Sequence, residues 1–424
     1  MSALKTTDIG LIPCEWDCVL FNEVAELRHG HQFRSYDFTT DGLKVVKITQ
    51  IKRNGTINLS SCSFIESNRL EEFNDDIIYK GDILIALTGA TIGKIARYNS
   101  EEVVLQNYRV GNFFSKDENK LNRDYLFQFL RSNLFFHQIL ARQTQSAQQN
   151  IGKDEINNMD LFLPPLPEQK AIAKVLTVFD DKIELLQAQN KTLETMAQTI
   201  FKEWFGKYQI GDELPEGWRV GKLGDIANLK SGYAFKSKEF VKESTKKALK
   251  IKDLKGDGKV SLDAVSCVSN DVTKLSRVQY FRLKEGDIVL AMSGNTTGKI
   301  GVIPPHSNEV YLNQRVGKFF MIKQDLNSFL YSFLMSGNYE EKILSMGYGS
   351  AQPNISPSQI ENIDIIYPNE EKLVSYLNIS NPIFNKVLDN NNQIQSHTKT
   401  RDTLLPKLMS GQVRVNNIKQ TANA

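Results

Sequence analysis

The sequence has 424 residues, which is more than one ordinary domain contains and indicates two large domains with connecting elements. With 41 % hydrophobic and 24 % charged residues, it has enough apolar side chains to form globular cores. No apolar run approaches the length of a membrane-spanning helix, and the first residues lack the pattern of a secretory signal. We therefore expect a cytoplasmic protein, and four cysteines are too few for a disulfide scaffold.

The net charge of +3 is too small to indicate a nucleic-acid partner, so the distribution of charge is more informative. Residues 28–57 contain six basic side chains against two acidic ones. Residues 230–259 contain ten lysines against four acidic residues. A single lysine-rich window is most simply a solvated surface. The matched spacing of these two windows favours a shared function.

The sequence contains one pattern twice. The motif I-P-x-x-W at residues 12–16 returns as L-P-x-x-W at residues 214–218. Further matched blocks are residues 24–33 and 226–235, 81–95 and 286–300, 107–114 and 313–320, and 146–151 and 350–355. A period of about 200 residues is too long for a solenoid, so the chain contains a duplicated domain.

Each copy is predicted to be a mixed α and β domain. The runs GDILIALTG at residues 81–89 and GDIVLAMSG at residues 286–294 are short, apolar and bounded by glycine, as buried strands are. Residues 125–140 and 329–344 have the length and periodicity of helices. We therefore expect a compact twisted sheet with a few helices in each copy.

A long helix is predicted after each copy. The sequence P-P-L-P-E-Q-K at residues 164–170 is a helix start, and the apolar residues that follow keep the 4-3 spacing of a coiled-coil seam. This seam is roughly 57 Å long at 1.5 Å per residue. The second seam continues to Leu408, and Pro382 is expected to kink or restart its helix, with Ser380 or Asn381 as the cap.

The seam positions Asn190 and Asn391 are polar and lie near the middle of their helices. A buried polar pair at such a position fixes the register of two helices. The expected divisions of the chain are a first domain at 1–165, a first long helix at 166–207, a second domain at 208–369, a second long helix at 370–415 and a polar tail at 416–424.

Several motifs resemble catalytic or metal sites but lack essential residues. The glycine turns at 89–95 and 294–300 are one residue too short for a phosphate loop and have Ile where Ser or Thr must hold Mg²⁺. A zinc site at Cys14, Cys18, His29 and His31 has no counterpart in the second copy. The nuclease-like E-x-K at 168–170 stands at a helix start, and no methyltransferase motif is present. We therefore predict no catalytic residue and no metal site.

The order of these pieces resembles the specificity subunit of type I restriction–modification systems. The resemblance runs from I-P-x-x-W at 12–16, through L-P-P-L-P-E-Q at 163–169, to L-L-P-K-L-M-S-G at 404–411. It implies two target recognition domains that each read one half of a bipartite site in double-stranded DNA. It also implies that the two long helices pack antiparallel as a coiled coil, with an internal pseudo-two-fold axis.

The resemblance further implies assembly with two methyltransferase subunits and with restriction motor subunits. Those subunits would bring S-adenosylmethionine, ATP and Mg²⁺, so the chain itself needs no cofactor. Two other functions stay open. One is a helical scaffold that does not bind DNA, and the other is an unrecognised nuclease or methyltransferase.

Comparison of the copies separates shared from divergent residues. Shared positions cannot distinguish two different half-sites and are scaffold or phosphate contacts. The phosphate candidates are Arg28, Lys94, Lys230, Lys246, Lys247, Lys250, Lys252 and Lys299. Divergent polar positions in matched loops are candidates for reading bases. They are His29, His31, Gln32, Arg34, Gln106, Tyr108, Gln143 and Gln145 in the first copy, and Ser231, Tyr233, Lys236, Gln314 and Tyr348 in the second.

Overall fold

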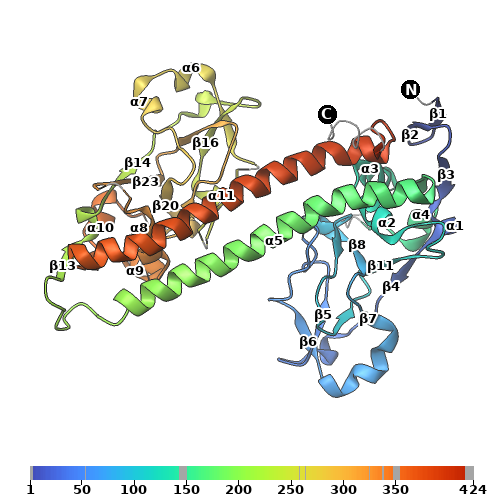
Figure 1. Ribbon diagram of the computed structural model, residues 1–424, viewed down its shortest axis with the longest axis horizontal. Coiled ribbons are helices and arrows are strands. Elements are labelled where there is room, and N and C mark those ends of the chain that lie inside the picture. The colour runs from blue at the N-terminus through green and yellow to red at the C-terminus, as the bar shows by residue number, and fades with distance from the viewer. Residues whose placement is uncertain are drawn as a thin grey trace. The chain divides into compact units, whose positions relative to one another are not determined.

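The computed structural model describes residues 3–52, 54–142, 150–256, 258–262, 264–323, 325–336, 339–346 and 354–415. The chain divides into two compact units (Figure 1). Unit 1 comprises Met1–Asp181 and Thr398–Ala424, and unit 2 comprises Lys182–His397. Both units combine sheets and helices, which confirms the predicted mixed fold class. The polar tail at 416–424 lies outside the described residues.

Unit 1 contains short strands and helices around the start of the first long helix. Its strands are β1 (Leu4–Thr7), β2 (Gly10–Pro13), β3 (Asp17–Leu20), β4 (Ala25–His29), β5 (Leu43–Val46), β6 (Ser63–Ile65), β7 (Ile77–Ile78), β8 (Ile83–Ala86), β9 (Ile95–Arg97), β10 (Val104–Gln106), β11 (Val110–Ser115) and β12 (Asp160–Leu163). Its helices are α1 (Phe21–Val24), α2 (Arg123–Leu130), α3 (Asn133–Arg142) and α4 (Lys153–Asn157), with 3-10 helices η1 (Ser35–Asp37), η2 (Ser67–Asp76) and η3 (Gly89–Thr91).

Unit 2 contains a similar series of short strands, α-helices and 3-10 helices. Its strands are β13 (Arg219–Lys222), β14 (Ala227–Ser231), β15 (Phe240–Val241), β16 (Lys246–Leu249), β17 (Leu254–Gly256), β18 (Lys259–Val260), β19 (Ser266–Val268), β20 (Ile288–Ala291), β21 (Ile300–Val302), β22 (Glu309–Leu312), β23 (Val316–Met321) and β24 (Asp364–Tyr367). Its helices are α6 (Asn270–Thr273), α7 (Ser276–Gln279), α8 (Asn327–Met335), α9 (Tyr339–Met346) and α10 (Pro357–Glu361), with η4 (Leu223–Asp225), η5 (Ser237–Glu239), η6 (Ile251–Asp253) and η7 (Gly294–Thr296).

The two units share the order of one four-stranded sheet, the parallel pair of a second sheet and a two-stranded pair, and they differ in their other strands. An antiparallel sheet has the order β4-β11-β8-β9 in unit 1 and β14-β23-β20-β21 in unit 2. A second four-stranded sheet contains one parallel pair, β5 with β10 in unit 1 and β16 with β22 in unit 2. A two-stranded pair, β3 with β12 or β13 with β24, precedes each long helix. The sequence repeat therefore corresponds to these shared elements.

The strands β8 and β20 are fully buried because both of their faces are covered. Ile83 and Ile85 point into one apolar cluster, whereas Leu84 and Ala86 point into another. Alternate residues of a strand face opposite sides of its sheet, so a strand covered on both sides has a continuous apolar sequence. β20 divides its side chains in the same way.

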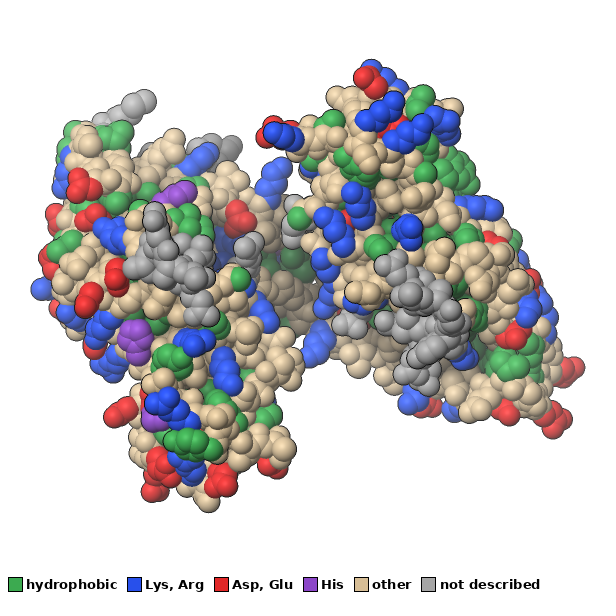
Figure 2. Space-filling model, turned by 180° about the vertical axis from the view of Figure 1, so that it is seen from behind, with side chains coloured by type: hydrophobic (Ala, Val, Ile, Leu, Met, Phe, Trp, Pro, Cys, Tyr) green, Lys and Arg blue, Asp and Glu red, His purple; other side chains and the backbone are tan. Residues whose placement is uncertain are grey.

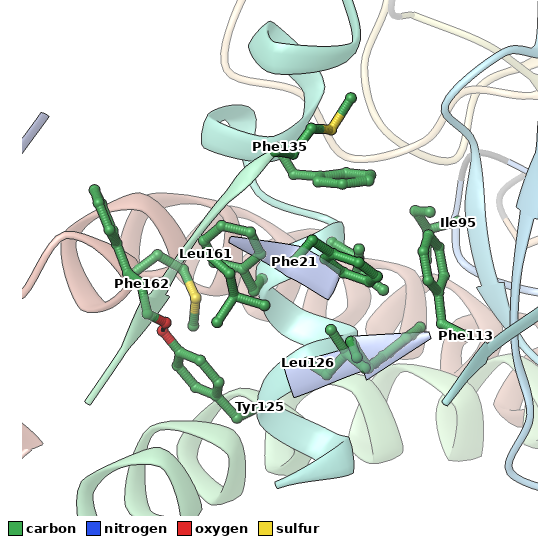
Figure 3. Packing of buried hydrophobic residues seen from close by; sticks show 14 of the residues in the cluster. Phe21, Ile95, Phe113, Tyr125, Leu126, Phe135, Leu161 and Phe162 are labelled. Carbon is green, nitrogen blue, oxygen red and sulfur yellow. Dashed lines mark hydrogen bonds between the residues drawn. The ribbon is translucent and has the colours of Figure 1, made fainter. Parts of the chain in front are cut away.

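The main core of unit 1 packs aromatic side chains against both long helices (Figure 3). The rings of Phe21 and Phe113 meet edge to face at 5.3 Å, and the Tyr125 hydroxyl donates a hydrogen bond to the Phe162 carbonyl at 2.8 Å. The core also contains residues from the start of α5 (Leu166–Phe205) and the end of α11 (Glu370–Met409). They are Ile172, Ala173, Leu176, Leu408 and Met409.

The main core of unit 2 contains the opposite ends of the two long helices. It contains Phe201 and Phe205 from the end of α5, and Leu373 and Tyr376 from the start of α11. The rings of Phe205 and Tyr376 lie 5.0 Å apart. Each unit therefore holds one end of both long helices.

The two long helices pack antiparallel within each unit. In unit 2 the Asn190 amide donates to Asn391 Oδ1 at 2.8 Å, and Phe201 contacts Tyr376 at 5.9 Å. In unit 1 Arg401 donates to Asp180 Oδ1 at 2.8 Å. In unit 2 the contact partners on α11 have lower residue numbers as the residue numbers on α5 increase, which is the pattern of antiparallel helices. None of the helices in the described part of the chain has the length and apolar character needed to span a membrane.

The expected restart of the helix at Pro382 is wrong, because α11 continues from Glu370 to Met409. Ser380 and Asn381 lie inside the helix and do not cap it. Ser328 of α8 lies 2.7 Å from the Ser380 hydroxyl and donates to Asn381 Oδ1 at 2.6 Å. A proline removes one backbone N–H from the helix, and these bonds join the two residues directly before Pro382 to a neighbouring helix.

Asp180 joins three elements of unit 1 through charged hydrogen bonds. It accepts from Gln128 at 2.9 Å and Arg131 at 2.7 Å, both on α2 or its end, and from Arg401 on α11. Burial by itself raises the pKa of Asp180, but the charge of Arg131 and the hydrogen bonds from Gln128, Arg401 and Arg131 hold this pKa below its usual value.

We predict that Asp180→Asn lowers the free energy of unfolding by about 3–5 kcal/mol at neutral pH, because two arginines lose their counter-charge. The native pKa is depressed, so this stabilisation is present above the pKa of the unfolded carboxyl and is lost as pH falls through the native pKa. Denaturant unfolding as a function of pH measures it. The exposed neighbour Asp181 provides the control, Asp181→Asn, and equal stability of the two variants contradicts the prediction.

Candidate nucleic-acid interface

Four segments of unit 1 meet at one end of its antiparallel sheet. The backbone N–H of His31 donates to the Gln106 carbonyl at 3.0 Å, and that of Tyr108 donates to the His31 carbonyl at 2.8 Å. The Leu87 N–H donates to the Arg109 carbonyl at 3.0 Å. The Ile151 N–H in turn donates to the Leu87 carbonyl at 3.1 Å. We call this assembly the loop cluster; it consists of residues 29–34, 87–94, 106–109 and 150–151.

Unit 2 builds the same loop cluster from residues 231–236, 292–299, 312–315 and 354–355. The Tyr233 N–H donates to the Leu312 carbonyl at 2.9 Å, and the Met292 N–H donates to the Arg315 carbonyl at 3.0 Å. The Ile355 N–H donates to the Met292 carbonyl at 2.9 Å. The blocks that the sequence repeats are therefore adjacent in space.

A glycine is required where two backbones cross in each loop cluster. A Cβ atom on Gly30 would lie 2.2 Å from the Gln106 carbonyl oxygen, and one on Gly232 would lie 2.2 Å from the Leu312 carbonyl oxygen. Gly89 and Gly294 are required for another reason, because their φ angles of +68° and +75° disfavour other residues. These shared glycines form the scaffold of the cluster.

The shared basic residues of the loop cluster lie in different surroundings. Arg109 and Arg315 are exposed; Arg109 donates to the Tyr108 hydroxyl at 2.7 Å, and Arg315 donates to the Ser293 hydroxyl at 3.2 Å. Lys94 lines a cavity of about 630 Å³ together with residues of α3 and α11. The half-buried Lys299 lies along β17, where a Cβ on Gly256 would be 3.8 Å from its side chain.

Four base-reading candidates of unit 1 are exposed residues at the end of β4 and directly after it. They are His29, His31, Gln32 and Arg34. The Nδ1 atom of His29 lies 3.2 Å from the Tyr108 carbonyl oxygen, and the ring of His31 packs on Phe33 at 4.8 Å. The structure therefore brings these four residues and the half-buried Tyr108 to one surface.

Gln106 does not belong to this surface, and its prediction as a base-reading residue is wrong. Its side chain is 3 % exposed and donates to the carbonyls of Arg28 at 3.0 Å and Val110 at 2.8 Å. Its amide therefore stabilises the loop cluster from inside. The sequence carried a signal, because the position that corresponds in unit 2 is the apolar and buried Leu312.

In unit 2, Lys236 and Gln314 are exposed, whereas Ser231 and Tyr233 are half-buried. The ring of Tyr233 packs on Phe235 at 4.9 Å, and the guanidinium of Arg277 lies 5.5 Å from it. Sequence comparison missed Arg277 because it lies on α7, outside the matched blocks. Gln143, Gln145 and Tyr348 lie outside the described residues.

Three of the four lysines in the 246–252 group, which were predicted as phosphate contacts, are half-buried and interact within unit 2. Lys246 pairs with Glu309, and Lys247 donates to Cys267 Sγ at 3.1 Å. The ammonium of Lys250 lies 3.8 Å from the ring centre of Phe240, and burial lowers the pKa of Lys250. Lys252 is exposed.

Other positive side chains remain available at the surface. Lys252 and Lys255 lie on η6 and β17, which pack on the glycine turn that precedes Lys299. Lys230 is exposed on β14. Arg28 is also exposed, pairs with Glu26 at 3.2 Å and lies over the ring of Phe114. Figure 2 shows blue side chains predominating over red ones across the middle of unit 2.

In the described part of the chain, no three His, Cys, Asp or Glu side chains gather in a way that would hold a metal ion. Burial, with the nearby Asp160, raises the pKa of Cys18 to about 11. A raised pKa lowers the fraction of the reactive thiolate.

Comparison with known proteins identifies the family to which this chain belongs. A family model described as the type I restriction modification DNA specificity domain matches residues 13–195 and again residues 215–397. The chain belongs to this family. The resemblance noted from the sequence is thereby confirmed, and the two matched ranges correspond to the two copies of the repeat.

Named relatives agree with this assignment. The type I restriction enzyme MjaVIII specificity subunit of Methanocaldococcus jannaschii is 31 % identical, and the match covers 81 % of each chain. The MjaIX specificity subunit of the same organism is 26 % identical over 97 % of this chain and 96 % of the relative. The crystal structure of a type I restriction–modification S subunit from M. genitalium has the same fold, with a TM-score of 0.58, 19 % identity and coverage of 96 % and 99 %.

We predict that Gly30→Ala destabilises unit 1 more than Gly89→Ala does. The added methyl of Gly30→Ala overlaps a backbone carbonyl, and overpacking of this kind costs about 1–3 kcal/mol or more. A Cβ on Gly89 meets no atom within 4 Å, so Gly89→Ala loses only the conformational preference, about 1 kcal/mol. Denaturant unfolding compares them, and an unchanged stability of Gly30→Ala contradicts the close crossing.

Proposed function

We propose that this chain is the DNA-specificity subunit of a type I restriction–modification complex. Each loop cluster reads one half of a bipartite DNA site. The observation that carries the proposal is the pair of loop clusters, which share their backbone hydrogen bonds and glycines but differ in their exposed polar side chains. A protein that reads two different half-sites needs a common scaffold with divergent contact residues.

Because the exposed residues of the two copies differ, the DNA site that they recognise is asymmetric. A homodimer presents identical surfaces and binds a palindrome, whereas these units present His31 and Arg34 in one case and Tyr233 and Lys236 in the other. Both long helices contribute to the core of each unit. Their length sets the spacer between the half-sites, in the manner of a ruler, and the polar pair Asn190 and Asn391 fixes their register.

The chemistry belongs to other subunits. Two methyltransferase subunits would dock on this chain and bring S-adenosylmethionine, and restriction motor subunits would bring ATP and Mg²⁺. The chain itself acts as the non-catalytic DNA-recognition subunit of a cytoplasmic complex. Its contribution to the reaction is to select the DNA sequence and to position the partner subunits on it.

We predict that exchanging residues 208–369 for the corresponding part of another specificity subunit changes one half of the methylated motif and leaves the other half intact. Sequencing of methylated bases in cells that carry the exchanged subunit measures this. The complementary exchange of residues 1–165 is the control and changes the other half. A change in both halves, or in neither, contradicts the assignment of one half-site to each unit.

We predict that Lys252→Ala, Lys255→Ala and Lys299→Ala, combined in the assembled methyltransferase complex, weaken binding to all DNA sequences alike. Each lost phosphate contact flattens the dependence of log K on log salt by about 0.9. Lys246→Ala is the matched control, because Lys246 is already paired with Glu309. DNA binding measured at several salt concentrations tests this, and equal slopes for the triple variant and the control contradict it.

A further inference from the structure

One short exposed turn of unit 1, η1, and one of unit 2, η5, occupy matched places in the sequence repeat and are closed by the same kind of hydrogen bond. In η1 the backbone N–H of Arg34 donates to Asp37 Oδ2 at 2.7 Å. In η5 the backbone N–H of Lys236 donates to Glu239 Oε2 at 2.7 Å. The acidic residue at the third position of each turn therefore fixes its backbone, and in unit 1 Arg69 also binds Asp37 at 3.0 Å.

The two turns rest on the same aromatic support. The residue after η1 is Phe38, whose ring lies 6.2 Å from that of Phe33. The residue after η5 is Phe240, whose ring lies 6.0 Å from that of Phe235. Phe33 and Phe235 are both buried, so each turn is attached to an apolar cluster.

A lysine caps this support in both units. The ammonium of Lys47 lies 3.8 Å from the ring centre of Phe38, and the ammonium of Lys250 lies 3.8 Å from that of Phe240. Such cation–π contacts restrict the ring and the backbone that carries it. The base of each turn therefore has the same pair of phenylalanines and the same lysine–ring contact, with a distance of 3.8 Å in both units.

The tips of the turns differ. Tyr36 in η1 is 84 % exposed, and the residue at the same place in η5 is the exposed Lys238. These two residues follow the exposed side chains of Arg34 and Lys236. Within the described part of the chain, no hydrogen bond, ion pair or ring contact of Tyr36 or Lys238 explains its identity.

The turns adjoin the loop clusters. His31 packs on Phe33 at 4.8 Å, and the corresponding Tyr233 packs on Phe235 at 4.9 Å. The same aromatic residue therefore supports a loop-cluster side chain and the turn. A tip placed in this way is preorganised beside the surface assigned to DNA, as precise recognition requires.

We propose that η1 and η5 carry specificity-determining residues at their tips, with Tyr36 contacting one DNA half-site and Lys238 the other. The inference rests on the proposed function and names residues that sequence comparison did not select. The Tyr36 ring offers an apolar edge that suits the methyl group of thymine. Lys238 has three donors and no acceptor, which suits the O6 and N7 acceptors of guanine in the major groove.

The test exchanges the tips by Tyr36→Lys and Lys238→Tyr, each in the full chain assembled with its methyltransferase subunits. The readouts are the methylated motif in genomic DNA and the binding of matched and mismatched duplexes at several salt concentrations. We expect each variant to change the preference at one base pair of one half-site, by roughly 5- to 150-fold, which corresponds to about 1–3 kcal/mol. The other half-site keeps its sequence.

Two controls have the same chemistry at other exposed positions. Tyr79→Lys replaces a tyrosine that is 63 % exposed in unit 1, and Lys274→Tyr replaces an exposed lysine of unit 2. Both should leave the motif unchanged. Tyr36→Phe keeps the ring and removes only the hydroxyl, so it retains the thymine preference even if Tyr36→Lys lowers the yield of folded protein.

An unchanged motif with the affinity of the unaltered complex overturns the inference. Weaker binding to every sequence with a smaller salt slope for Lys238→Tyr also overturns it, because that result identifies a phosphate contact. The proposed function fails separately: if exchange of residues 208–369 alters one half-site but the tip variants do not, only the inference about the tips is wrong.

Discussion

Both units depend on apolar burial of the ends of the two long helices. The core of unit 1 contains Leu176 from the start of α5 and Leu408 from the end of α11. The core of unit 2 contains Phe205 from the end of α5 and Tyr376 from the start of α11. Burial of one such side chain stabilises a fold by about 1.5–3 kcal/mol. Unit 1 is therefore incomplete until residues more than 200 positions further along the chain have packed into it.

Polar groups between the helices fix the register of the two helices. The Asn190 amide donates to Asn391, and Asn390 donates to Asn190 Oδ1 at 2.8 Å. Displacement of one helix by a turn would leave these buried amides without partners. Asp180 has the same effect in unit 1, since any displacement of α11 separates it from Arg401. The apolar ends hold the helices on the cores, and the polar contacts select one alignment.

Duplication explains how one chain recognises two sequences with one scaffold. The close backbone crossings at Gly30 and Gly232 require the same residue in both copies, and the fully buried strands β8 and β20 require apolar residues throughout. Exposed positions carry no such constraint. The exposed residues at the tips of η1 and η5 and in the loop clusters therefore differ between the copies, and these differences leave the packing unaffected.

The sequence by itself determined the features that depend on local or periodic patterns. The repeat, the buried strands, the two long helices and the placement of Asn190 and Asn391 on a shared seam all follow from the spacing of apolar residues and glycines. These patterns are readable because burial on one face or on both leaves a period of 2 or 3.6 residues, or an unbroken apolar run.

Only the tertiary structure decided which polar side chains are available to a partner. Gln106 and Lys246 look like exposed contact residues in the sequence, yet one binds backbone carbonyls inside the loop cluster and the other pairs with Glu309. Pro382 suggested a new helix start, yet α11 runs through it, and Ser328 bonds to the two residues before it. In each case the partner lies more than 40 residues away or is a backbone atom brought close by folding. The free energy of a polar or charged group depends on such partners, and they leave no periodic trace in the sequence.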